Sequence, residues 1–304
     1  MALRLIHLSD IHVWRYTWNA RRLFGLRILG VMELLMGRAR RFPMDRLDAV
    51  VDRVRSLDPD HILITGDLTT TALPSEFQQA RRLLAPILGD RERVTMIPGN
   101  HDRTTRRSYF TRRFEAAFGE FMPSTTFPWI RRLDDETGIL GMDATRWHWH
   151  FSPRGYLPEG QLAAARALTA DPANLPRRLI VACHYPVAAP PLYRVELALK
   201  RLENEQAVRD WLKTIGPHLY CCGHVHAAWA IRPEEIPNQL CLNSGSPTMI
   251  DPTGLRLPGF LEILLDDDRV AVSHHAWTGA DWKVVPMIED SLTATASDLP
   301  SFTA

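Results

Sequence analysis

Aspartate, asparagine and histidine recur in this chain at the ends of short apolar segments. The pairs Asp10–His12 and His224–His226 each place two donors two residues apart, so on an extended segment both side chains share one face. The other donors are Asp67, Asn100, His101, Asp102 and His184. Carboxylate, amide and imidazole ligands without thiolate suit borderline metals such as Mn, Fe, Zn, Ni or Co better than Ca²⁺ or Mg²⁺. This donor set predicts a metal site.

Each group of donors follows a short apolar run that is typical of a buried β-strand. The runs are residues 3–9, 61–65, 94–97, 179–183 and 219–222. Between them, residues 44–57 and 77–88 carry apolar side chains at helical spacing. Alternating strands and helices are typical of α/β folds, in which ligand sites lie beyond the carboxyl ends of the strands. We therefore expect the donors to converge on one site.

The rest of the chain shows weaker patterns. Residues 109–121, 162–168 and 202–215 look helical, and strand-like segments follow at 227–231, 239–243, 260–265 and 270–277. The Asp266-Asp267-Asp268 step is typical of a hairpin turn. From residue 278 the periodicity is lost. We expect a single domain over residues 1–277 and a C-terminal tail over 278–304.

Composition excludes several classes of protein. The 304 residues include 36 Lys or Arg and 35 Asp or Glu, and the net charge of +1 gives no reason to expect a nucleic-acid partner. The four cysteines form no C-x-x-C pair and are too few for a disulfide framework, which indicates a reducing compartment. The N-terminal stretch is too polar for a secretory signal, and Ile28–Gly37 is too short to cross a bilayer. We expect a cytoplasmic protein, either free in the cytoplasm or peripheral to the inner face of the membrane.

The order of the donor motifs resembles that of the calcineurin-like metallophosphoesterases. The pattern D-x-H, GD, GNH[DE], H, GHxH occurs here as Asp10-Ile11-His12, Gly66-Asp67, Gly99-Asn100-His101-Asp102, His184 and Gly223-His224-Val225-His226. One such motif is weak evidence, whereas all five in order over residues 10–226 are specific. The resemblance implies an α/β sandwich of two mixed β-sheets packed together, with helices on both outer faces in a four-layer αββα arrangement.

The same resemblance implies a centre of two metal ions of Mn, Fe or Zn. One metal would be held by Asp10, His12, Asp67 and His226, and the other by Asp67, Asn100, His184 and His224. Asp67 would bridge the two. Two cations roughly 3.5–4 Å apart clamp a phosphoryl group and activate a water molecule, which agrees with this donor set.

The implied activity is hydrolysis of a phosphoester by metal-bound hydroxide. His101 would protonate the leaving oxygen, Asp102 would orient His101, and the neighbouring Arg103 is expected to be solvated. A general acid matters most for a poor leaving group, which favours a phosphodiester such as a cyclic nucleotide. The alternative is a membrane-surface UDP-diacylglucosamine pyrophosphatase or lipid phosphatase. Enterobacterial-type enzymes of that kind carry Arg at the position of His101. A non-catalytic scaffold of this fold is a remote alternative, because no ligand position is missing.

An insertion follows the first two donors. Residues 14–41 hold seven arginines and one acid, Glu33, for a local charge of +6, and they are also rich in apolar side chains. This composition is typical of an interfacial helix. The segment has three possible roles: peripheral contact with an anionic membrane, contact with a nucleotide, or packing on the core or in a dimer. The substrate is therefore expected to be a small nucleotide or lipid-linked phosphoester, and the sequence predicts no oligomeric state.

Overall fold

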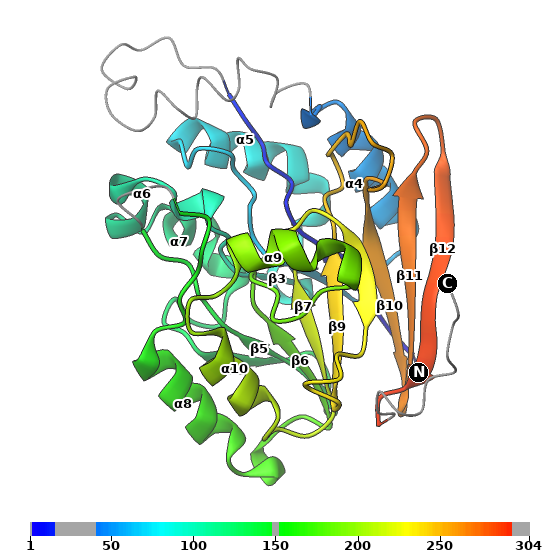
Figure 1. Ribbon diagram of the computed structural model, residues 1–304. Coiled ribbons are helices and arrows are strands. Elements are labelled where there is room, and N and C mark those ends of the chain that lie inside the picture. Colours follow the sequence, from blue (N-terminus) through cyan, green and yellow to red (C-terminus); the bar gives the residue numbers. More distant parts are fainter. Residues whose placement is uncertain (1, 16–40, 148–151, 294–304) are drawn as a thin grey trace.

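The computed structural model describes residues 2–15, 41–147 and 152–293, and it consists of two β-sheets with helices around them (Figure 1). The first sheet has the strand order β12-β11-β10-β1-β2-β3. Its strands are β1 (Leu3–Leu8), β2 (His61–Ile64), β3 (Val94–Met96), β10 (Gly259–Asp266), β11 (Arg269–Trp277) and β12 (Trp282–Ser291). Strands β1, β2 and β3 are parallel, whereas β10, β11 and β12 are antiparallel to their neighbours. This sheet is therefore mixed.

The second sheet has the order β4-β5-β6-β7-β9-β8. Its strands are β4 (Trp129–Arg132), β5 (Thr137–Gly141), β6 (Arg178–Ala182), β7 (His218–Cys222), β8 (Ala228–Ile231) and β9 (Gln239–Ser244). Strands β5, β6, β7 and β9 are parallel, and β4 and β8 are antiparallel edge strands. Both sheets are mixed, as the sequence predicts.

Successive side chains of β6 face opposite sides of the second sheet and show how the layers pack. Ile180 joins the core shared with the first sheet, whereas Val181 faces a second core with α8 and α10. The helices are α4 (Arg46–Ser56), α5 (Pro74–Leu84), α6 (Arg106–Phe110), α7 (Arg113–Phe118), α8 (Glu159–Thr169), α9 (Arg194–Lys200) and α10 (Glu205–Leu212). Helices α4 and α5 pack against the first sheet (Figure 1). The predicted α/β sandwich with helices on both outer sides is confirmed.

The predicted strands that precede the donor motifs are confirmed as β1, β2, β3, β6 and β7. The hairpin at residues 266–268 is also confirmed, since β10 and β11 pair around it and Asp267 has a φ of 49°. The helix expected at 109–121 is interrupted, because Arg112 adopts a φ of 49° between α6 and α7.

The prediction of a tail from residue 278 is wrong over residues 282–291, which form β12. This strand pairs with β11, and a register shift falls between Val272 and Ser273 opposite Pro286. An edge strand contacts one neighbour only and can stay half-exposed on both faces, so it needs no clear apolar alternation. Pro286 sits where a strand tolerates proline, at an edge and a bulge. The first sheet therefore extends beyond the predicted domain end.

Most of the predicted insertion at 14–41 lies outside the described residues. Its two described ends lie close together, since Trp14 Nε1 donates to the Phe42 carbonyl at 2.8 Å. The Arg41 carbonyl accepts from the Ile250 amide at 2.6 Å. Within the described ranges, the structure contains no helix long and apolar enough to cross a membrane.

The buried His61 in β2 predicts a pH dependence of stability. Its Nε2 lies 2.7 Å from Thr95 Oγ1, and burial, together with Arg131 and Arg93, lowers its pKa from 6.5 to about 3. Below pH 6.5 the unfolded chain gains a proton that the folded chain does not, so this group lowers stability as the pH falls from 6.5 towards 3. At a pH about two units below 6.5 the loss is roughly 3 kcal/mol.

Guanidinium unfolding at neutral and acidic pH tests this expectation. His61→Gln keeps a hydrogen-bonding group beside Thr95 but cannot titrate, so its free energy of unfolding should fall less on acidification than that of the wild type. Parallel losses in the two proteins would show that His61 does not contribute to the pH dependence.

Candidate metal centre

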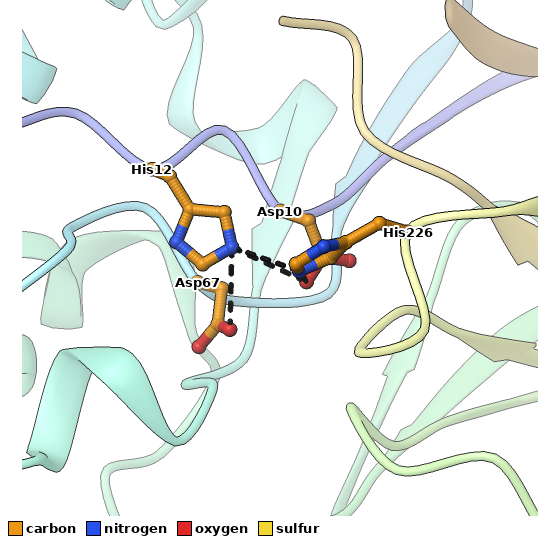
Figure 2. Close-up of side chains that lie close together, drawn as sticks. All are labelled: Asp10, His12, Asp67 and His226. Carbon is orange, nitrogen blue, oxygen red and sulfur yellow. Dashed lines mark hydrogen bonds and ion pairs between the residues drawn. The ribbon is translucent and has the colours of Figure 1, made fainter. Parts of the chain in front are cut away.

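Four predicted donors converge beyond the carboxyl ends of β1, β2 and β7. The candidate ligand atoms of Asp10, His12, Asp67 and His226 all lie within 4.8 Å of one another, and Figure 2 shows the four side chains pointing toward one point. His226 Nε2 lies 3.2 Å from Asp10 Oδ1 and 3.0 Å from His12 Nε2. His12 Nε2 lies 3.7 Å from Asp67 Oδ2.

A second group of donors shares Asp67 with the first. The candidate ligand atoms of Asp67, His184 and His224 also lie within 4.8 Å of one another. His184 Nε2 is 3.4 Å from Asp67 Oδ2 and 3.1 Å from Asn100 Oδ1. The structure thus brings all seven expected ligand residues into two adjoining groups, with Asp67 between them.

The unsatisfied oxygens at the centre fit bound cations. Asp10 and Asp67 are buried, yet among the described residues neither Asp10 Oδ1 nor Asp67 Oδ2 has a hydrogen-bond partner. A buried carboxylate oxygen without a donor is costly unless a cation compensates it. The other oxygens are used, because Asp10 Oδ2 accepts from the His224 amide and Asp67 Oδ1 from the His101 amide. The orphaned oxygens are the ones that face the histidine Nε2 atoms, so the donor set fits metal ions.

The backbone at these donors is unusual. Asp10, His12, Asp67, His224 and His226 all have φ between 53° and 74°, in the left-handed region. Aspartate and histidine are among the non-glycine residues that adopt this region most readily. The left-handed turns occur where the chain leaves β1, β2 and β7, and they set the direction of these five side chains.

A glycine beside these turns allows a close approach of two strand ends. A Cβ at Gly223 would overlap Ser9 Oγ and Asp10 Oδ2. We expect Gly223→Ala to push Asp10 away from His224 and to lower metal content at least about tenfold, because the added Cβ overlaps the short, buried side chains of Ser9 and Asp10, which have little room to rotate away. Plasma mass spectrometry after dialysis measures this. The control is Gly216→Ala, where the added Cβ meets nothing within 4 Å. Full metal occupancy in Gly223→Ala would contradict the expectation.

Backbone carbonyls orient the two histidines of the second group. His184 Nδ1 donates to the Thr65 carbonyl at 2.7 Å, which turns its Nε2 toward Asp67. His224 Nε2 donates to the Lys200 carbonyl at 3.1 Å, which leaves Nδ1 as its candidate ligand atom. Such partners fix the tautomer and the ring orientation of metal-binding histidines.

The pKa shifts of Asp67 and His224 favour the deprotonated forms that bind metals, whereas the shift of His184 favours its protonated form. Burial favours a raised pKa for Asp67, but the charges of His184 and His101 hold its pKa well below the usual range. Burial, with His184 and Lys200, keeps the pKa of His224 well below 6.5. Although burial alone would lower it, Asp67 raises the pKa of His184 to about 9. His184 must therefore release a proton when a metal binds.

His101 stands at the edge of the first group. Its ring centroid is 4.8 Å from that of His12, in an edge-to-face arrangement. His101 Nδ1 lies 2.9 Å from the Thr70 carbonyl, so this contact places the donor proton on Nδ1 and directs Nε2 away from Thr70.

Asp102 acts differently from the expectation that it orients the His101 ring. Its carboxylate accepts from the amides of Gly99, Leu68 and Thr69 and from the Thr69 hydroxyl. The bond that orients the ring comes from the Thr70 carbonyl instead. Asp102 therefore ties the loop after β3 to the loop after β2 and positions His101 through the backbone.

The expectation that Arg103 is solvated is wrong. Arg103 is buried, and its Nη2 lies 2.8 Å from both Glu115 and Asp143. Its guanidinium carbon also lies 5.7 Å from the centre of the Tyr109 ring. Two carboxylates compensate the buried charge, and they come from α7 and from the segment after β5. The segment that carries His101 is therefore clamped from two sides.

Sequence reasoning missed the groups that line and orient the site. The Phe42 ring packs 4.6 Å from the His12 ring and 5.7 Å from the His226 ring, and so forms one wall. The carbonyls of Thr65, Thr70 and Lys200 carry no side-chain signature that a sequence pattern could reveal. Phe42 could have been suspected as part of the site wall, because it directly follows the basic insertion that starts beside His12.

Comparisons with a family model, a curated protein and solved structures all find similarity to phosphoesterases. The family model described as calcineurin-like phosphoesterase matches residues 3–228. A curated protein of Rhodococcus erythropolis, a probable cyclic nucleotide phosphodiesterase, is 26% identical over 190 residues, which cover 60% of this chain and 58% of that protein. A dimetal phosphatase from Danio rerio superposes with a TM-score of 0.62 at 14% identity, covering 94% of this chain and 99% of the other. A purple acid phosphatase from yellow lupin gives a TM-score of 0.65 at 13% identity, covering 100% and 57%.

Proposed function

This chain belongs to the calcineurin-like phosphoesterases, a family of metal-dependent phosphoester hydrolases, and we propose that its own substrate is a phosphodiester. The observation that carries this proposal is the position of His101 beside the two groups of donors, where a proton donor can serve a poor leaving group. An alkoxide leaves slowly without a proton, whereas a phosphate leaving group needs little help.

We assign the ligands in two sets. Asp10, His12, Asp67 and His226 would hold one metal. Asp67, Asn100, His184 and His224 would hold the other. Metals bound there would neutralise the phosphoryl oxygens and lower the pKa of a water molecule, and the donor set accepts Mn, Fe or Zn.

The protein side chains supply the remaining steps. In its protonated form, His101 holds Nδ1–H on the Thr70 carbonyl and can pass the proton on Nε2 to the departing oxygen. Asp102 keeps the loop that carries His101 in register with Asp67. Because His101 also donates its amide to Asp67 Oδ1, the acid and the shared carboxylate keep a fixed separation.

The relative from Rhodococcus erythropolis supports a cyclic nucleotide as the first substrate to test, since its name describes a probable cyclic nucleotide phosphodiesterase. A second candidate is a lipid-linked pyrophosphate or phosphate, hydrolysed at a membrane surface. The basic and apolar composition of residues 14–41 favours it.

Phosphorus NMR of the Mn-loaded protein, incubated with cyclic AMP and a lipid-linked pyrophosphate together in detergent, separates the candidates. Loss of the cyclic diester signal, slowed in His101→Ala, would support the phosphodiesterase. Loss of the pyrophosphate signal alone, with little effect of the substitution, would overturn it in favour of the lipid-linked substrate. No hydrolysis of either compound by a protein with two bound metals would reject both candidates.

A further inference from the structure

Helix α9 has apolar side chains on two faces. Its inner face carries Leu197, which packs with Val225 and Trp229 in a small core. Its outer face carries Val195 and Leu199, and Leu192 in the preceding turn continues the same face at helical spacing. Surface helices normally present polar residues outward, so a second apolar face requires an explanation.

The outer face projects into solvent. Val195 is 78% exposed, and Leu192 and Leu199 are each 65% exposed. Side chains this exposed contact little of the described part of the chain. Helix α9 lies in front of the strands in Figure 1, which agrees with its position on the outside of the molecule.

A loop beside α9 repeats the pattern. Leu255 and Leu257 are 64% and 46% exposed, and Arg256 between them holds this loop against α9. Arg256 pairs with Glu196, donates to the Val225 carbonyl at 3.0 Å and lies 5.2 Å from the centre of the Tyr193 ring. The α9 surface, defined as Leu192, Val195, Leu199, Leu255 and Leu257, is therefore formed by two elements that are fastened together.

The charges around the α9 surface are mixed, and among the residues of α9 and its flanking turns Arg194, Lys200 and Arg201 outnumber Glu196. Arg194, Arg201 and Arg154 are exposed there; Arg201 pairs with Glu205 at 3.1 Å, and Arg154 Nε donates to the Leu199 carbonyl at 3.4 Å. Glu196 is already paired with Lys200 and Arg256, and Asp251 accepts from Thr253 and from the Arg256 amide. Aliphatic side chains that project among cations match the headgroup and acyl regions of an anionic bilayer.

We propose that the α9 surface docks the protein on anionic phospholipid membranes. The five aliphatic side chains enter the acyl boundary, and the surrounding arginines lie at the level of the lipid phosphates. The surface adjoins the candidate metal centre, because the Lys200 carbonyl at the end of α9 bonds to His224. Docking therefore holds the centre close to the bilayer, whichever phosphoester it hydrolyses.

Vesicle sedimentation tests the proposal with the full-length protein. Wild type should bind phosphatidylcholine vesicles that contain phosphatidylglycerol, and bind pure phosphatidylcholine vesicles far less. Val195→Ser combined with Leu199→Ser should weaken binding at least about tenfold. The variant loses the free energy gained when the aliphatic groups of Val195 and Leu199 move from water into the acyl region of the bilayer. The matched control is Leu168→Ser combined with Val284→Ser, which changes two exposed aliphatic residues on α8 and β12.

The outcomes are distinct. Thermal unfolding and hydrolysis of a soluble aryl phosphodiester show that the variants fold, since none of these residues belongs to the centre. Failure of the wild type to bind anionic vesicles, or equal binding by the wild type and the α9 variant, would overturn the proposal. Equal vesicle binding by the two proteins would favour residues 14–41 as the membrane contact instead. A wild-type dimer that becomes monomeric in the α9 variant, without vesicle binding, would overturn it in favour of a contact between two copies.

Discussion

Replacing Asp67 by asparagine is expected to reduce bound metal from two equivalents to at most one and to slow phosphodiester hydrolysis about a thousandfold. Asp67 belongs to both groups of donors, and its Oδ2 faces both His12 and His184. The amide has nearly the same shape and can still accept from the His101 amide, but it carries no charge to hold two cations together. Loss of a two-metal clamp removes several kcal/mol of transition-state stabilisation, and each 1.4 kcal/mol is roughly tenfold in rate.

Metal content and kcat on an aryl phosphodiester measure the effect of Asp67→Asn. The matched control is Asp90→Asn, which alters an exposed carboxylate that caps the turn before β3. Retention of both metals and most of the activity in Asp67→Asn would show that Asp67 is not the shared ligand.

Replacing His101 by alanine is expected to slow cleavage of an alkyl phosphodiester by about 10²–10⁴-fold, the usual contribution of a general acid. The same variant should lose less than about tenfold on a nitrophenyl diester, because that leaving group departs without a proton. The contrast between substrates arises only if His101 acts on the leaving oxygen.

The two substrates serve as controls for each other, and metal analysis completes the experiment. His101→Ala should keep two metal equivalents, since the His101 side chain belongs to neither group of donors. Equal losses on both substrates would indicate that His101 positions the loop or the metals and does not donate the proton.

The convergence of the candidate ligand residues was predictable because each one follows a short strand, and the family resemblance grouped them into two sets. Asp67 and His184 directly follow short apolar strands, and parallel strands bring their carboxyl ends to one edge. This logic covers Asp10, His12 and the His224–His226 pair as well, so the convergence follows from periodicity and the order of motifs.

The parts that escaped prediction depend on contacts between distant segments. Arg103 is buried because Glu115 and Asp143 compensate its charge, and neither partner is adjacent in sequence. Asp102 accepts from backbone amides, which every residue except proline offers, so its target has no sequence signal. Strand β12 escaped for a different reason, since an edge strand that is half-exposed on both faces lacks the alternation of a core strand.

The left-handed backbone at five donors has a consequence for the balance between stability and activity. Each non-glycine residue in that region costs on the order of 1 kcal/mol, even for residue types that tolerate it well. Glycine at these positions would relax the turns and stabilise the metal-free fold, but it would remove the ligands. The backbone strain thus lowers the stability of the metal-free fold but fixes the directions of the candidate ligand side chains in advance. A metal that binds there would therefore lose little free energy to ordering these side chains.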